Sequence, residues 1–180
     1  MNSENFKTMK KLVLLGFLFM FLFSCNKKDD VDDINNINVE EFIELLKKGE
    51  YKFLKLPPFT AEEIPLLLQH RNENQMITNF PHSMVSSFMV PECKLGIYVL
   101  WTIESIRTDA IKSEYLIGGF PSQNPVLALR NSEELQLVDD DESHAVAAKA
   151  YFDWWNENKH KDFDEFKNID PLAETGYRWH

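Results

Sequence analysis

The sequence predicts a mostly α-helical single domain, built around a central helix at about residues 92–112, with irregular segments and at most a small β-hairpin. Two observations lead to this class. Apolar side chains recur at helical spacing along the central segment, and further apolar residues fall on its other faces, which is typical of an enclosed helix. An alanine-rich segment at 143–158 predicts a second long helix. The central stripe comprises Leu95, Val99, Ile103, Ile106 and Ala110.

Residues 1–24 are predicted to be an export signal that takes no part in the fold. They begin with a lysine-containing stretch and continue as an unbroken apolar run over residues 12–23. As a helix this run spans roughly 18 Å, well short of the ~30 Å hydrocarbon core that a membrane-spanning helix must cross. Met1 and Met9 are both suitable starts, because two lysines follow Met9 directly.

The signal ends in Leu22-Phe23-Ser24-Cys25, which resembles the lipobox of bacterial lipoproteins. This resemblance implies that the lipoprotein signal peptidase cuts before Cys25 and that the Cys25 thiol carries a diacylglycerol. The small side chain of Ser24 suits such a cleavage site, because it leaves the scissile bond accessible. An uncleaved signal anchor and an ordinary secretory signal are the alternatives.

The residues after the cysteine bear on which membrane face the protein occupies. Lys28, Asp29 and Asp30 resemble the lipoprotein export signal of Bacteroidetes-type bacteria. The resemblance implies an outer-membrane lipoprotein that faces the cell exterior, and the alternative is the periplasmic face of that membrane. Residues 25–37 are predicted to be a flexible acidic tether reaching roughly 20 Å as a coil, and residues 38–180 the single globular domain.

The mature chain is strongly acidic, which restricts its partners. Removing residues 1–24 takes three lysines and Glu4 from 19 basic and 29 acidic residues, and so leaves 16 against 28. Nucleic acid is therefore not an expected partner, because binding it depends on Lys and Arg that neutralise phosphates. With Cys25 lipidated, Cys93 is the only other cysteine, so no intramolecular disulfide is expected.

Two short helices are predicted before the central one. Asn38 is a suitable N-cap for a helix that ends near Gly49, where a glycine readily takes the left-handed conformation that ends helices. Thr60 and Glu63 form a capping-box pattern for the next helix. Pro65 leaves two alternatives there, a kinked helix or a helix that begins at the proline.

The second half of the chain is less regular. Residues 115–141 contain short apolar runs among glycines and prolines, and periodicity alone does not assign them to strands or to extended segments. The acids of 139–142 are expected to complement the macrodipole of the following helix, and a short helix is expected near 163–168. The helix at 143–158 is predicted to bury one stripe, formed by Ala145, Ala148, Phe152 and Trp155.

No established metal motif is present, and no cofactor is expected. An EF-hand loop starting at Asp139 would need Gly and Glu where His144 and Ala150 stand, so the acids at 139–142 are interpreted as helix-start charges. Histidines at i, i+4 or in an HExxH arrangement would indicate zinc. The chain has neither among His70, His82, His144, His160 and His180.

Two pairs of residues are candidates for reactive or binding groups. Cys93 lies near a predicted helix start, where the dipole lowers a thiol pKa, and with His82 nearby it would be a nucleophile. The favoured alternative is a buried structural cysteine. Glu104 and Arg107 lie three apart on the enclosed helix and are predicted to be a structural ion pair, with a ligand-binding pair as the alternative.

Aromatic residues near the end of the chain suggest a platform on which a sugar ring stacks. The alternative is that these rings belong to the core. Because adjacent residues of a helix point in different directions, at most one of Trp154 and Trp155 is expected to be deeply buried. The candidate platform is formed by Tyr151, Trp154, Trp155 and Trp179.

Three segments, 92–107, 120–125 and Tyr177-Arg178-Trp179, together resemble an uncharacterised lipoprotein family of Bacteroidetes-type bacteria. That family is a domain of unknown function, so the resemblance implies no activity and no catalytic residue. We therefore expect a non-catalytic binding or accessory protein of the cell envelope, whose partner is an envelope protein or a glycan. The alternative is a small envelope hydrolase acting on glycans, with a site assembled from scattered residues.

Overall fold

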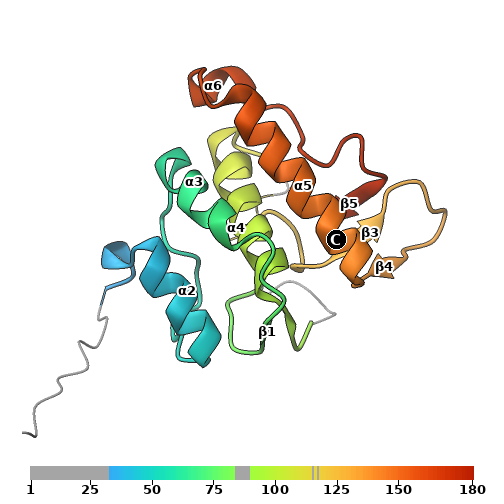
Figure 1. Ribbon diagram of the computed structural model, residues 1–180. Coiled ribbons are helices and arrows are strands. Elements are labelled where there is room, and N and C mark those ends of the chain that lie inside the picture. Colours follow the sequence, from blue (N-terminus) through green and yellow to red (C-terminus); the bar gives the residue numbers. More distant parts are fainter. Residues whose placement is uncertain (1–32, 84–89, 115, 117) are drawn as a thin grey trace, which may run out of the picture. The chain divides into compact units, whose positions relative to one another are not determined.

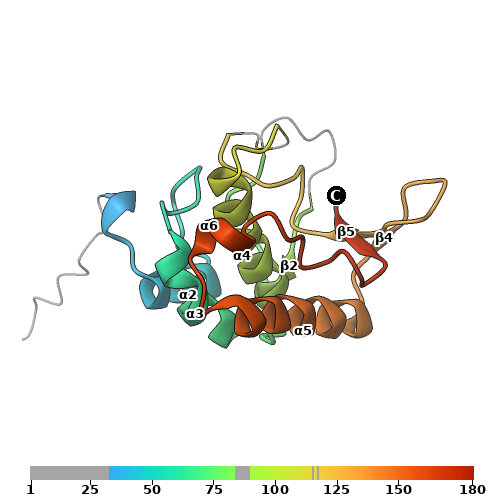
Figure 2. The same cartoon turned by 90° about the horizontal axis from the view of Figure 1, so that it is seen from above.

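The computed structural model describes residues 33–83, 90–114, 116 and 118–180. Within them the chain forms five α-helices, three short 3-10 helices and five short strands. The long helix α4 lies between α2 and α3 on one side and α5 on the other (Figure 1), and in the turned view α5 runs along one side of it (Figure 2). None of the described helices is both long and apolar enough to cross a membrane.

Helix α4, Leu95–Ala110, forms the centre of the core. Every residue from Leu95 to Thr108 is buried, as expected for a helix with apolar residues on more than one face. Trp101 is fully buried, and its ring stacks on that of Phe120 with the centroids 5.2 Å apart. The predicted central helix is confirmed, although it begins later than residue 92.

The start of α4 packs too closely against its neighbours to allow a side chain at residue 96. A Cβ on Gly96 would lie 2.5 Å from the Arg71 carbonyl oxygen and 2.5 Å from Nε2 of His144. That Nε2 donates a hydrogen bond to the Arg71 carbonyl at 2.8 Å. Glycine is therefore what lets α4, the turn at Arg71 and the start of α5 meet at one point.

Helix α2, Val39–Lys48, has the predicted boundaries. The Asn38 side chain accepts a hydrogen bond from the backbone N–H of Glu41 at 2.9 Å, and Gly49 ends the helix with a φ of 66°. A 3-10 helix, Ile34–Asn36, precedes it.

The next helical segment is three short pieces in a row. Thr60 and Glu63 form the predicted capping box, which opens a 3-10 helix that leads into α3. Pro65 lies in the first turn of α3, where a missing N–H leaves no hydrogen bond unmade. The alternative of a helix that begins at the proline is therefore closer to the structure than a kink, since α3 begins one residue before it. The pieces are Ala61–Glu63, Ile64–Leu67 (α3) and Leu68–His70.

Two small antiparallel sheets complete the fold. Strands β1 and β2 form one, and the other has the order β4-β3-β5. Leu127 in β3 pairs with Val138 in β4 on one side and with Trp179 in β5 on the other. The strands are Met76–Ile77 (β1), Cys93–Lys94 (β2), Leu127–Leu129 (β3), Leu137–Val138 (β4) and Tyr177–Trp179 (β5).

The expectation of at most one small hairpin was too low. The β3–β4 hairpin is present, but β5 joins it from far along the chain, and β1–β2 is a separate sheet. Strands of two or three residues are too short to show alternation in the sequence. The described domain is therefore a mixed arrangement of helices and two small sheets rather than a clearly all-helical one.

Helix α5, Asp141–Asn158, was predicted correctly as an element but with the wrong inner face. Ala148 is buried as expected, whereas Ala145 and Phe152 are exposed and Trp155 is half-buried. The buried face lies about one residue earlier in the sequence than the predicted stripe. The prediction was wrong because α5 carries large aromatic side chains on both faces and a histidine on the inner one. The residues it buries are Ser143, His144, Ala147, Ala148, Tyr151, Trp154 and Asn158.

The short helix α6, Phe163–Phe166, follows α5 as expected. Asp162 and Glu165 form its capping box. The rings of Phe163 and Phe166 lie edge to face with Trp154 of α5, at centroid distances of 6.3 and 5.2 Å. This aromatic cluster fixes α6 against the end of α5.

Candidate functional site

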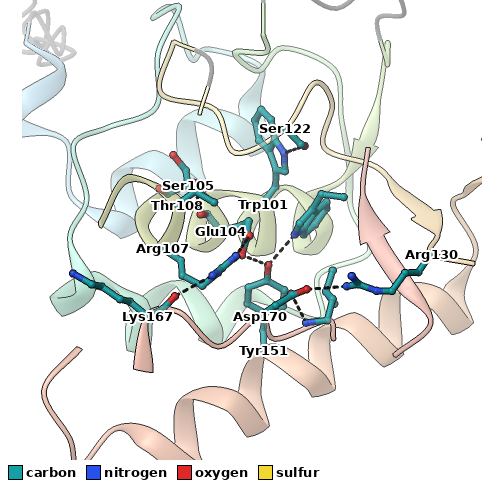
Figure 3. Close-up of polar contacts among 12 residues, drawn as sticks. Trp101, Glu104, Ser105, Arg107, Thr108, Ser122, Arg130, Tyr151, Lys167 and Asp170 are labelled. Carbon is teal, nitrogen blue, oxygen red and sulfur yellow. Dashed lines mark hydrogen bonds and ion pairs between the residues drawn. The ribbon is translucent and has the colours of Figure 1, made fainter. Parts of the chain in front are cut away.

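A cleft of about 610 Å³ opens beside the C-terminal half of α4. Its walls come from that helix, from residues 121–123 and from strand β5, and several of its residues belong to a network of polar contacts (Figure 3). The charged side chains in its lining are Glu104, Arg107, Arg130, Asp170 and Arg178.

The innermost charges of the cleft are Glu104 and Arg107, whose side chains are 7% and 9% exposed. Arg107 donates from Nε to Oε2 at 2.9 Å and from Nη2 to Oε1 at 2.6 Å, so the pairing is bidentate. Its Nη1 donates to the Lys167 carbonyl at 2.9 Å. Burial lowers the pKa of Arg107, but the hydrogen bond and the charge of Glu104 outweigh it and the pKa is raised. The predicted ion pair between Glu104 and Arg107 is confirmed.

Tyr151 extends this pair to strand β5. Its hydroxyl donates to Oε2 of Glu104 at 2.7 Å and accepts from Nε1 of Trp179 at 2.8 Å. Burial, and then the charge of Glu104, raise the pKa of Tyr151 well above its usual value, so the hydroxyl stays protonated. We call the linked side chains of Glu104, Arg107, Tyr151 and Trp179 the Glu104 network. It joins α4, α5 and β5.

Arg130 and Asp170 form a second pair at the edge of the cleft. Nη2 of Arg130 donates to Oδ2 of Asp170 at 2.8 Å, and its Nε donates to the Tyr177 carbonyl at 3.1 Å. The other oxygen of Asp170 accepts from the backbone N–H of Leu172 at 2.9 Å. Both side chains are about one-third exposed, so this pair is reachable from solvent in a way that the Glu104–Arg107 pair is not.

Trp101 holds the wall of the cleft that residues 121–123 form. Its Nε1 donates to the hydroxyl of Ser122 at 2.8 Å, and that hydroxyl donates to the Asn124 carbonyl at 3.0 Å. Gln123, between them, is exposed and lines the cleft. The segment is therefore fixed to α4 while one amide side chain remains at the surface.

The predicted aromatic platform is not assembled as an exposed surface. Tyr151 is fully buried and Trp154 is only 4% exposed, so the faces of these two rings are not available to a sugar. Trp155 and Trp179 are half-buried. The expectation that at most one of Trp154 and Trp155 is deeply buried is confirmed.

Cys93 is not placed as a nucleophile. It lies in strand β2, directly before the N-cap residue of α4, and is 3% exposed. Burial raises the pKa of its thiol, and the charges of Asp139 and Glu92 raise it further. The favoured alternative, a buried structural cysteine, fits this position. The ring of His82 lies with Nδ1 3.4 Å from the Phe80 carbonyl.

The acids at 139–142 act at the start of α5. Asp140 accepts a hydrogen bond from the backbone N–H of Ser143 at 2.6 Å, which holds the pKa of Asp140 below its usual value. Lys94 donates to Asp141 at 2.8 Å. The helix-start interpretation is confirmed, and no group of three or more metal-ligating side chains occurs among the described residues.

Sequence reasoning missed Arg130, Asp170 and Arg178. The sequence shows only that arginine is rare, at four residues in the chain, and the structure shows that three of the four line this cleft. Their spacing along the chain gives no indication that they meet. The predicted lipidation residue Cys25 and the predicted export signal Lys28-Asp29-Asp30 lie outside the described residues.

Comparison with known proteins gives a family and no activity. Neither the curated proteins nor the solved structures contain a match. A family model, described as a domain of unknown function (DUF4943), matches residues 33–180. This span contains every element of the described domain, including β5 and the whole of the cleft. The chain therefore belongs to the DUF4943 family.

Proposed function

We propose that this protein is a lipid-anchored, non-catalytic binding protein of the outer membrane, which captures a small polar ligand in the cleft between α4 and β5. The observation that carries the binding function is the cleft itself. Its volume of about 610 Å³ falls within the roughly 300–1,000 Å³ typical of ligand pockets. Its lining combines fixed charges with the amide of Gln123 and the half-buried Trp179.

Binding is favoured over catalysis because the acid and base groups beside the cleft are already engaged. Glu104 accepts three hydrogen bonds, from Arg107 and Tyr151. A general base must be within reach of the proton that it removes. A carboxylate that is paired, buried and hydrogen-bonded on both oxygens is poorly suited to that role. The alternative of a small envelope hydrolase therefore has less support.

The anchoring part of the proposal rests on the N-terminal sequence. The lipobox-like residues imply a lipid on Cys25, and Lys28, Asp29 and Asp30 imply export to the cell exterior. The described domain begins at Asp33, and as a coil the residues between Cys25 and Asp33 would reach roughly 15 Å, which holds the domain clear of the headgroups. A domain in that position meets glycans and other soluble compounds first, and we propose that the small polar ligand of the cleft is among them.

The binding proposal is tested by equilibrium dialysis of the full-length lipidated protein, in detergent micelles, against a defined mixture of sugars, sugar acids and organic acids. Mass spectrometry then identifies what is retained. We expect at least one compound to be enriched with its mass unchanged. A Gln123→Trp variant, which fills the cleft, should lose this enrichment, whereas Gln136→Trp, at an exposed position outside the cleft, should keep it.

Two results contradict the binding proposal. Conversion of a compound to a product of different mass would favour the hydrolase, and equal retention by Gln123→Trp would place binding elsewhere on the protein.

The anchor is tested by Cys25→Ala. The variant should lose metabolic labelling with a fatty acid and move from the membrane to the soluble fraction, and persistent labelling would contradict a lipid on Cys25. Protease added to intact cells should remove the domain of the unmodified protein. Its survival, with the protease shown to digest a known surface protein, would favour the periplasmic face.

A further inference from the structure

Arginine is concentrated at the cleft far beyond its frequency in the chain. The 180 residues contain four arginines, and Arg107, Arg130 and Arg178 all line this one cleft. They come from helix α4, from the residue after β3 and from β5. No lysine is part of the lining, although the chain has fifteen. The positive side chains of the lining are therefore all guanidinium groups, and none is an ammonium group.

The three guanidinium groups differ in how far each is committed to a partner. Arg107 is held by both oxygens of Glu104, and Arg130 shares one bond with Asp170 at 2.8 Å. Arg178 is exposed, and within the described part of the chain it pairs with no carboxylate. The one hydrogen bond that its side chain makes there runs from Nη1 to the Trp179 carbonyl at 3.3 Å. Among the side chains of the lining, three guanidinium groups therefore face two carboxylates.

We propose that the cleft recognises the oxyanion group of its ligand, a carboxylate or a phosphate, with Arg178 as the main contact and Arg130 as the second. This inference rests on the proposed function and names the chemical class of the ligand. Arginine suits the role because its planar fork donates two parallel hydrogen bonds to a carboxylate or phosphate, which a lysine cannot do.

The acidity of the rest of the molecule restricts anion binding to the cleft. The chain carries a formal charge of −10, so most of its surface repels an anion. Arg107, which stays on Glu104, supplies a fixed positive group at the inner wall of the cleft. Arg178 is free to turn towards a ligand, and Arg130 has donors left beside those it gives to Asp170 and Tyr177.

The experiment compares three probes that share one ring. Glucose, glucuronate and glucose 6-phosphate differ in the group at C6, which is neutral, a carboxylate or a phosphate. Each is titrated into the full-length lipidated protein in detergent at constant ionic strength, and affinity is measured by ligand-observed NMR. We expect one of the two anionic probes to bind at least about tenfold more tightly than glucose, because charge-assisted hydrogen bonds are the stronger ones.

Three variants identify the contact. Arg178→Gln should weaken binding of the anionic probe by about tenfold or more, and Arg178→Lys, which keeps the charge but not the fork, should lie between it and the unmodified protein. Lys159→Gln removes the same charge at an exposed position outside the cleft. It should bind like the unmodified protein.

The inference is overturned if glucose binds as well as both anionic probes, if Arg178→Gln binds the preferred anion as tightly as the unmodified protein, or if neither anionic probe binds. None of these results by itself removes the proposed function. Retention of an unchanged neutral compound in the dialysis experiment, lost in Gln123→Trp, would still support a binding cleft.

Discussion

Glu104 is the side chain on which the inner wall of the cleft depends. Its two oxygens accept three hydrogen bonds, two from Arg107 and one from Tyr151, at a site that solvent barely reaches. A buried ion pair is stable only while both members are present, because removing one leaves the other charged, desolvated and unpaired. The pair therefore matters more for keeping the wall in place than for net stability.

Glu104→Gln tests this dependence at a single residue. The change keeps the size of the side chain but removes its charge, and we expect the free energy of unfolding in urea to fall by about 3 kcal/mol. Glu44→Gln is the control, since Glu44 pairs with Lys48 on the surface, where both side chains are 58% exposed. The control should cost at most about 1 kcal/mol. Equal effects of the two variants would contradict a structural role for the buried pair.

His144 makes stability depend on pH. Burial is the largest cause that lowers the pKa of His144 below its ordinary value of 6.5. The charge of Lys94 acts in the same direction, while the Arg71 carbonyl and the carboxylates of Asp141 and Asp139 oppose it. The unfolded chain then takes up a proton at a higher pH than the folded one. The contribution of His144 to the free energy of unfolding is therefore fully present above about pH 6.5 and decreases as the pH falls below that value.

His144→Gln isolates that contribution, because a glutamine amide also donates to the Arg71 carbonyl but does not titrate. Urea unfolding at several pH values between about 5 and 7.5 should give a stability difference between the two proteins that changes in favour of the variant as the pH falls. A difference that stays constant over this range would show that His144 has the same pKa in both states.

Gly96→Ala gives a prediction opposite in sign to helix propensity. On an unobstructed helix the change stabilises by up to about 1 kcal/mol. At residue 96 the new Cβ would lie 2.5 Å from the Arg71 carbonyl and from His144, and overpacking of this kind costs about 1–3 kcal/mol. Thermal unfolding should show a lower melting temperature. A rise would mean that α4 and α5 can separate at little cost.

At the scale of elements, β5 is the least self-sufficient part of the cleft. It is an edge strand of three residues, and it pairs only with β3. Such a strand adds few backbone hydrogen bonds, so its position depends on side chains that fasten it to the helices. The indole of Trp179 on the hydroxyl of Tyr151 is the described contact that does this.

Tyr151→Phe should therefore release β5 before it unfolds the domain. Amide hydrogen exchange is expected to speed up at Arg130 and His180, whose N–H groups donate to the Gly176 and Val126 carbonyls. It should change little at Leu129, which donates across the β3–β4 pair to Gln136. The measurement is residue-resolved exchange by NMR, which reports local opening separately from global unfolding.

Tyr98→Phe is the matched control for the lost hydroxyl, because the Tyr98 hydroxyl is also buried but donates to the Pro81 carbonyl and not to a group that holds β5. Faster exchange at His180 in this control, or none in Tyr151→Phe, would show that β5 is not held through Trp179.

For the molecule as a whole, the sequence predicts those parts of the fold that are determined locally. Capping residues such as Asn38 and Thr60 act within one turn, and the apolar stripe of α4 repeats over four turns, so both can be read along the chain. The inner face of α5 could not be assigned in the same way. Its buried side includes His144 and Asn158, which only their hydrogen bonds make compatible with the core.

The cleft was beyond sequence reasoning for a related reason. The Glu104–Arg107 pair is local, three residues apart on one helix, and it was predicted. Arg130 and Arg178 reach the same place only because β5 pairs with β3 across 48 residues of chain, and strands this short carry no pattern of their own. Tertiary pairing thus determines the part of the site that would contact a ligand.

The central claim is that the cleft beside α4 is where the ligand binds. Hydrogen–deuterium exchange of the full-length lipidated protein, with and without whichever of glucuronate and glucose 6-phosphate binds more tightly, tests it most directly. We predict slower exchange confined to Ser122, Gln123 and residues 178–180, which line two sides of the cleft. Protection along the exposed face of α5, or no change in either cleft segment, would contradict the account.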